Sequence, residues 1–189
     1  AGAIAFDKLL NPAAGLPAPV EAAQTDPCWL FYTSGTTGKP KGAIWNHRTV
    51  EVVIMNYLAD LHNIQPGETV LHAAPMSHGS GIIALPAVAR GAVNIIFENK
   101  SFEPKALLAT VEKMKVSHIA FLAPTQIIKM LEEFVPGEYD VSSLRAICFG
   151  GAPIYVEHLR NAIKAFGPVF TQLYGQGESP MTITHLSRE

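Results

Sequence analysis

Segments with helical spacing alternate with short apolar runs along most of the chain. Val50, Val53, Tyr57 and Leu61 recur every three or four residues, as on one face of an amphipathic helix. Runs such as 117–122 and 144–149 are instead apolar at nearly every position, which is typical of strands buried on both faces. The alternation predicts an α/β fold, a mostly parallel sheet with helices on both faces.

The predicted elements follow one another in a regular order. We expect strands at 69–74, 92–97, 117–122, 144–149 and 169–173, and helices from 46 and 104 and at 81–90, 125–134 and 155–166. Asn46 is a suitable N-cap, and Pro104 fits a first helical turn. Residues 1–27 form a lead-in with one helical turn at Phe6–Leu10 and then a proline-rich linker. Residues 28–189 form the folded domain.

A hairpin rich in glycine and hydroxyl groups precedes the first long helix. Strands at 28–33 and 42–46 flank a turn whose free N–H groups, hydroxyls and lysines suit an anion. No acidic residue lies between Asp26 and Glu51. We therefore expect a polyphosphate to contact this turn. The candidate residues are Thr33, Ser34, Gly35, Thr36, Thr37, Gly38, Lys39 and Lys41.

The turn differs from the ordinary nucleotide P-loop. Gly35 precedes the Gly38–Lys39 pair by too few residues, and Pro40 stands where that motif has a magnesium-binding hydroxyl. A strand-like run at 42–45 follows instead of a helix, which argues against a P-loop phosphotransferase. A surface hairpin with solvated lysines is the simplest alternative.

Three polar loops follow predicted strands. They contain His78, the pair Gly150–Gly151, and the segment 174–178. Ligands of open α/β sheets bind beyond the carboxyl ends of strands, so these loops predict a site on one rim. The glycines let a flat group lie against backbone, Tyr174 can stack on a base, and Glu178 can ligate Mg²⁺. Taken singly, each has a structural alternative: a tight turn, a core tyrosine, a solvated glutamate or a structural histidine.

The segment Tyr32–Gly42, YTSGTTGKPKG, resembles the signature of the adenylate-forming (AMP-binding) superfamily. That superfamily includes acyl-CoA synthetases, peptide-synthetase adenylation domains and luciferases. The resemblance implies part of the N-terminal domain of an acyl-CoA synthetase, with the phosphate-loop hairpin ahead of its sheet. It also implies ATP and Mg²⁺ as cofactors and coenzyme A as a co-substrate. A carboxylate would be adenylated and then transferred to a thiol.

The resemblance also implies roles for single residues. Lys41 and the turn contact phosphates, and His78 borders the carboxylate and thioester region. Glu178 holds magnesium. The remaining nucleotide contacts are Gly151, Ala152 and Pro153 at the adenine, Tyr174 stacked on it, and Gly175, Gln176 and Gly177 in the same loop.

One position departs from the family pattern Tyr-Gly-x-Thr-Glu. Gly177 replaces the threonine that contacts the α-phosphate, which removes a hydroxyl donor. A backbone N–H, a water molecule or Ser179 could substitute for it.

The resemblance covers only the middle of such an enzyme. Family members have further sequence ahead of the glycine loop, and later a ribose-binding aspartate and a lysine-bearing C-terminal domain, which lie outside this chain. We therefore expect a fragment that binds nucleotide weakly and does not turn over. The segments 75–81 and 174–180 favour a fatty acid as substrate. An aromatic acid, or a non-catalytic nucleotide-binding module, is the alternative.

Composition adds limits rather than a function. The chain is 48% hydrophobic with a formal net charge of −2, which gives no indication of nucleic-acid or anionic-membrane binding. Its two cysteines, Cys28 and Cys148, do not form a disulfide framework. Neither a membrane-spanning run nor a signal peptide is visible, so we expect a cytoplasmic protein.

Overall fold

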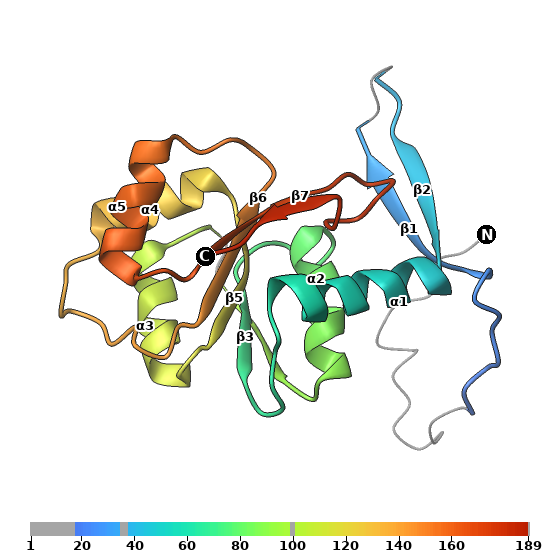
Figure 1. Ribbon diagram of the computed structural model, residues 1–189, viewed down its shortest axis with the longest axis horizontal. Coiled ribbons are helices and arrows are strands. Elements are labelled where there is room, and N and C mark those ends of the chain that lie inside the picture. Colours follow the sequence, from blue (N-terminus) through green and yellow to red (C-terminus); the bar gives the residue numbers. More distant parts are fainter. Residues whose placement is uncertain (1–17, 35–37, 99–100, 189) are drawn as a thin grey trace.

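The computed structural model describes residues 18–34, 38–98 and 101–188 (Figure 1). Residues 18–26 are exposed and lack helix or strand. The helical turn expected at Phe6–Leu10 lies outside the described residues, and so do Gly35, Thr36 and Thr37. The boundary proposed at residue 28 stays a prediction.

The described residues form one six-stranded sheet with the order β4-β3-β5-β6-β7-β8. Five strands are parallel, and β8 runs antiparallel to β7. This confirms the predicted mostly parallel sheet, although β8 was not predicted. The strands are β3 (Thr69–His72), β4 (Val93–Ile96), β5 (His118–Leu122), β6 (Ala146–Gly150), β7 (Phe170–Tyr174) and β8 (Thr184–Leu186).

Helices cover both faces of this sheet, as predicted (Figure 1). On one face lie α3 (Pro104–Met114), α4 (Pro124–Glu133) and α5 (Val156–Phe166). The other face carries α1 (His47–Asn56), its π-helical continuation η2 (Tyr57–Leu61) and α2 (Gly79–Ala89). The Asn46 side chain caps α1 by accepting a 2.8 Å hydrogen bond from the Thr49 N–H.

Successive strand residues fill two separate cores. Leu71, Ile119 and Ile147 pack with the α3, α4 and α5 side. Their neighbours Val70 and Cys148 pack on the opposite side. Both faces of each strand are therefore buried, which explains why the strands read as unbroken apolar runs.

The predicted hairpin is present as β1 (Pro27–Thr33) and β2 (Lys41–Asn46), paired antiparallel outside the main sheet. Its inner face is aromatic. The rings of Phe31 and Trp45 stack with centroids 5.0 Å apart, and they pack against Val53 of α1 and Ile82 of α2. This packing fixes the hairpin beside the carboxyl-end rim of the sheet.

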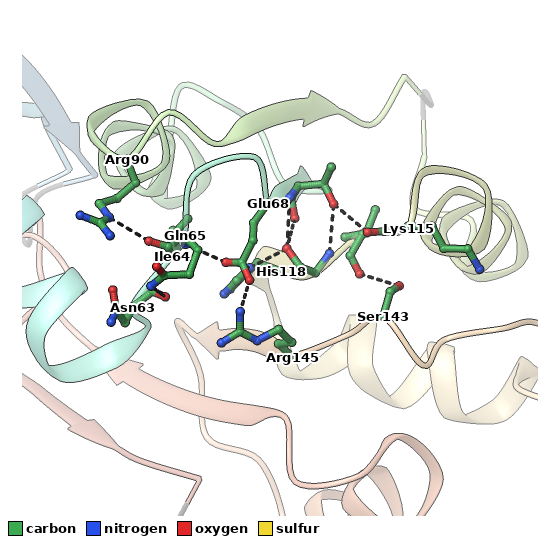
Figure 2. A network of polar contacts seen from close by, with 12 residues as sticks. Asn63, Ile64, Gln65, Glu68, Arg90, Lys115, His118, Ser143 and Arg145 are labelled. Carbon is green, nitrogen blue, oxygen red and sulfur yellow. Dashed lines mark hydrogen bonds and ion pairs between the residues drawn. The ribbon is translucent and has the colours of Figure 1, made fainter.

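A polar network joins the other ends of the strands (Figure 2). The Glu68 carboxylate accepts a 2.8 Å hydrogen bond from the Gln65 N–H and pairs with Arg145. It also lies 3.7 Å from Nδ1 of His118. Glu68, His118 and Arg145 precede or begin β3, β5 and β6. The network therefore links the amino-terminal ends of these strands, opposite the predicted site.

Candidate nucleotide site

The hairpin and all three predicted loops meet at one cavity of about 450 Å³. Thr33 and Ser34 enter from β1, and His78 from the loop after β3. Loops that are far apart in sequence therefore share one space. The predicted residues lining it are Thr33, Ser34, His78, Gly151, Gly175, Gln176 and Gly177.

A single hydrogen bond connects the hairpin to the loop after β7. The indole N–H of Trp45 donates to the carbonyl oxygen of Gly177 at 2.7 Å. Trp45 is 2% exposed, so this donor is shielded from water. The bond fixes how far the hairpin stands from the rim.

The close approach of these segments requires glycine at position 177. A Cβ atom added there would lie 2.3 Å from Cγ2 of Thr33 and 3.1 Å from Cδ1 of Phe31. Real Cβ atoms do not come so near, so a larger residue would displace the hairpin or turn Thr33 aside. A side chain at position 177 would therefore require Thr33 or the hairpin to move.

A second cavity of about 510 Å³ adjoins the first. The two share Gly151, Leu173 and Gly175. Tyr174 is 52% exposed over this second cavity, and its hydroxyl accepts a 3.0 Å hydrogen bond from Nε2 of Gln176. An exposed ring beside bare backbone can accommodate a flat heterocycle. Other lining residues are Ala152, Pro153, Gln172, Thr184, His185 and Leu186.

Two glycines of the rim are required by the backbone. Gly151 has φ +79°, a conformation that side chains rarely adopt. A Cβ on Gly175 would lie 2.2 Å from the backbone nitrogen of Met181. Met181 itself has φ 61°, which is uncommon for a residue with a side chain. The segment after β7 is therefore folded tightly back along the rim.

His78 is exposed, and its ring lies 5.4 Å from the ring of Phe31. The nearby His72 is buried. Its Nε2 donates to Oδ1 of Asn94 at 2.6 Å, and its Nδ1 lies 3.0 Å from the Ser80 hydroxyl. Burial lowers the pKa of His72, which keeps it a neutral structural residue. Of the two, only His78 faces the cavity.

Some predicted site residues do not line either cavity. Lys39 and Lys41 are exposed on the hairpin. Glu178 lines a neighbouring hollow of about 300 Å³ beside Arg48 of α1, which shares Pro180 with the smaller cavity. Within the described residues no three histidine, cysteine or acidic side chains gather as a metal site.

Sequence reasoning did not find the apolar wall of the smaller cavity. Phe31, Trp45, Ile82, Phe121 and Met181 all line it. The alternation of Trp29, Phe31 and Thr33 along β1 indicated a buried face. It did not indicate which elements would pack against that face.

A profile of the AMP-binding enzyme family matches residues 3–189, nearly the whole chain. The chain belongs to the AMP-binding enzyme family. Several proteins similar to this chain are named as CoA ligases or CoA synthases. The medium/long-chain-fatty-acid–CoA ligase FadD8 of Mycobacterium tuberculosis is 32% identical over 188 residues, which is 98% of this chain and 32% of that protein. A feruloyl-CoA synthase of an Amycolatopsis species is 32% identical over 198 residues, 98% of this chain and 39% of that enzyme.

Solved structures of the AMP-binding family share the fold. The o-succinylbenzoate coenzyme A synthetase MenE of Bacillus subtilis in complex with AMP matches with a TM-score of 0.75 at 28% identity, over 88% of this chain and 33% of that one. The amide bond synthetase McbA of Marinactinospora thermotolerans matches with a TM-score of 0.74 at 26% identity, over 84% of this chain and 30% of that one. The chain spans about a third of the length of these relatives. Among the described helices, none is long and apolar enough to cross a membrane.

Proposed function

We propose that the protein carrying this chain activates a carboxylic acid with ATP and then joins the acyl group to coenzyme A. The observation that supports this is the meeting of the phosphate-loop hairpin with three strand-end loops around adjoining cavities. Such a rim in a chain of the AMP-binding family suits a nucleotide laid across both cavities.

In this proposal the adenine enters the larger cavity, between the Tyr174 ring and the backbone of Gly151–Pro153. The phosphates then extend into the smaller cavity, toward Thr33 and Ser34. Lys39 and Lys41, which are exposed on the hairpin, supply positive charge near this end of the nucleotide. His78 borders the place of the acyl group.

The chemistry needs no side-chain nucleophile. A carboxylate oxygen of the substrate attacks the α-phosphorus of ATP, and the bond to the bridging oxygen breaks to release pyrophosphate. The thiolate of coenzyme A then attacks the acyl carbon, and AMP leaves with the electron pair. Negative charge grows on phosphate oxygens in the first step. Hydroxyl and backbone N–H donors on the rim stabilise this charge, together with the exposed lysines of the hairpin.

The exposed Glu178 carboxylate fits a magnesium ion bound together with the nucleotide. Mg²⁺ commonly takes one or two protein carboxylates and completes its shell with phosphate oxygens and water. When bound it would neutralise part of the phosphate charge. The carboxylate would have to act from the mouth of the hollow beside Arg48.

The wall of the smaller cavity favours an acid with a large apolar part. Phe31, Ile82, Phe121 and Met181 offer no charge to a second polar end. We propose a fatty acid, and the similarity to a fatty-acid–CoA ligase supports it. An aromatic acid is the second candidate, because the feruloyl-CoA synthase is equally identical to this chain.

Pyrophosphate release tests both statements. The full-length protein is incubated with ATP, Mg²⁺ and, separately, hexanoate, dodecanoate, hexadecanoate, ferulate, coumarate and benzoate. Release that requires a fatty acid, followed by thioester formation with coenzyme A, supports the first candidate. Release that requires ferulate or coumarate supports the second. ATP binding without release for any acid would support a non-catalytic nucleotide-binding module instead.

We further propose that residues 1–189 alone do not turn over. The chain spans about a third of the length of its relatives, so most of such an enzyme has no counterpart in this segment. Thioester formation by this segment, at the rate of the full-length protein, would refute the statement.

A further inference from the structure

The edge strand β8 forms part of the wall of the larger cavity. All three of its residues, Thr184, His185 and Leu186, line that cavity of about 510 Å³. In the antiparallel ladder Thr184 lies opposite Tyr174, and Leu186 lies opposite Gln172. Opposite residues of such a pair project from the same face of the sheet. These four side chains therefore form one surface beside the cavity.

Packing contributes little to holding β8 in place. It is an edge strand of three residues, all of them exposed. Within the described structure, none of them belongs to the two apolar clusters that fill the cores of the sheet. A cavity of about 250 Å³ lies between the end of β8, at Leu186 and Arg188, and Leu159 and Ile163 of α5. So short a strand needs a further contact to keep its position.

Arg188 provides such a contact. Its Nη1 donates a 2.6 Å hydrogen bond to the carbonyl oxygen of Arg145, the residue before β6. The bond therefore joins β8 to a strand two places away in the sheet. Arg145 is itself fixed, because its N–H donates to the Ser117 carbonyl at 2.8 Å and its guanidinium pairs with Glu68 (Figure 2). The polar network at the amino-terminal ends of the strands thus extends to β8.

We propose that Arg188 is a positioning residue for the base of the nucleotide. By holding β8 beside β7, it completes the surface on which Tyr174 and a purine lie. In the described structure Arg188 lines the neighbouring cavity of about 250 Å³ and not the larger one, so it acts through β8. The inference rests on the proposed function, because it assigns the support of the same nucleotide site.

Ligands with and without a base separate this role from a general effect on the site. We would measure dissociation constants of AMP, ATP and inorganic tripolyphosphate by calorimetry for the full-length protein and for Arg188→Met and Arg188→Lys. Arg160→Met is the matched control. It removes the same charge from α5, at an exposed position that lines neither cavity in the described structure.

We expect Arg188→Met to weaken AMP and ATP binding about three- to ten-fold, as for one lost hydrogen bond, with tripolyphosphate affinity unchanged. Arg188→Lys keeps a cationic donor and should recover most of the affinity. In the acid-dependent reaction, the KM for ATP should rise by the same factor while kcat and the KM for the acid stay unchanged. The reason is that the base is bound equally before and during the chemical step.

Hydrogen exchange reports on β8 without any ligand. Peptides that cover residues 182–188, followed by mass spectrometry, should exchange faster in Arg188→Met and at the unaltered rate in Arg160→Met. Addition of AMP to the unaltered protein should slow this exchange, because a base in the larger cavity contacts the ordered strand.

Unchanged AMP affinity in Arg188→Met would overturn the inference, whether or not exchange becomes faster. Equal losses for AMP and tripolyphosphate would also overturn it, and so would a lysine variant that binds no better than the methionine variant. The proposed function is judged separately, by acid-dependent pyrophosphate release from the unaltered protein. That release can persist when the Arg188 effects are absent, and its failure would leave a measured effect of Arg188 on AMP binding intact.

Discussion

The indole N–H of Trp45 and the carbonyl oxygen of Gly177 lie 2.7 Å apart, although 132 residues separate them in sequence. This bond joins the phosphate-loop hairpin to the loop that follows the last parallel strand. Each partner belongs to a segment that lines the shared cavity. Several properties of the proposed nucleotide site depend on it.

Removing the indole donor should loosen the hairpin. We expect Trp45→Phe to lower the free energy of unfolding by about 1–2 kcal/mol, from one hydrogen bond and some packing. ATP affinity should fall as well, because Thr33 is no longer held at the rim. Urea denaturation and calorimetry measure the two effects. Trp29→Phe is the control, since Trp29 packs against Trp45 without bonding to Gly177. Equal ATP affinities in both variants would contradict this account.

Gly175 should not tolerate even a methyl group. In Gly175→Ala the new Cβ would meet the backbone of Met181 at 2.2–2.4 Å, which only a shift of the chain can relieve. We expect a loss of stability of about 1–3 kcal/mol and weak nucleotide binding. Gly79→Ala provides a matched control for stability, because its Cβ would lie 3.7 Å from Sδ of the same Met181, an ordinary contact. Similar melting temperatures for the two variants would show that the tight fold at Gly175 is unimportant.

The Tyr174 ring should contribute to binding and little to folding. Half of it is exposed, so Tyr174→Ala should leave the melting temperature nearly unchanged. Stacking of a base on an aromatic ring contributes about 1–3 kcal/mol, which corresponds to a loss of roughly five-fold to 150-fold in ATP affinity. Tyr174→Phe keeps the ring and loses only the hydrogen bond from Gln176, so it should bind nearly as the unaltered protein does. Equal losses in both variants would assign the effect to the hydroxyl instead.

The polar network at the amino-terminal ends of the strands should make the stability of the fold sensitive to acid (Figure 2). Burial lowers the pKa of His62 to about 3 and that of His118 to about 4. The Glu68 carboxylate offsets part of this lowering for the pKa of His118, whereas neighbouring basic groups lower the pKa of both histidines further. These groups are His118, Arg188, Arg145 and His185 for His62, and Arg145 and Arg188 for His118. Both histidines therefore stay neutral in the folded chain.

The sign of the effect follows from proton uptake. An unfolded histidine binds its proton near pH 6.5, whereas these two remain unprotonated in the fold until pH 4 or below. Stability is complete above pH 6.5 and falls as the pH drops, by up to about 1.4 kcal/mol per pH unit for each histidine. Urea midpoints between pH 7.5 and 5 should record this slope.

A variant of His62 should reduce the acid sensitivity. Its Nε2 has no hydrogen-bond partner in the described part of the chain, so His62→Leu leaves no broken bond behind. We expect stability near that of the unaltered protein at pH 7.5 and about half the slope in acid. His158→Gln on α5, which packs against Tyr155, should keep the full slope. An unchanged slope in His62→Leu would contradict the assignment.

The sequence patterns predicted most of the sheet and its helices because burial on both faces leaves a strong signal. Runs around Ile119 and Ile147 could only be buried strands, and Asn46 marked the start of α1 as an N-cap. The strand β8 gave no such signal, since Thr184, His185 and Leu186 are all exposed and too few for a pattern. Its position depends on pairing with β7, which is a tertiary contact.

The site was predictable as a set of loops on one rim, because parallel strands end on the same side. Its internal relations were not. Nothing local to Gly177 indicates that Thr33 fills its side-chain space, or that Trp45 bonds to its carbonyl. Glu178 follows Gly177 directly, yet it lines a different hollow. Such details depend on how the hairpin packs on α1 and α2, many residues away.

The order of the strands in the sheet has a consequence for synthesis on the ribosome. From β3 through β5 and β6 to β7, each new parallel strand joins the same advancing edge. The hairpin is synthesised before Gly177. The Trp45 N–H therefore cannot form its hydrogen bond to the Gly177 carbonyl until that residue has left the ribosome. A nascent chain should therefore be unable to bind nucleotide until β7 and the turn that follows it, including Gly177, have left the ribosomal exit tunnel.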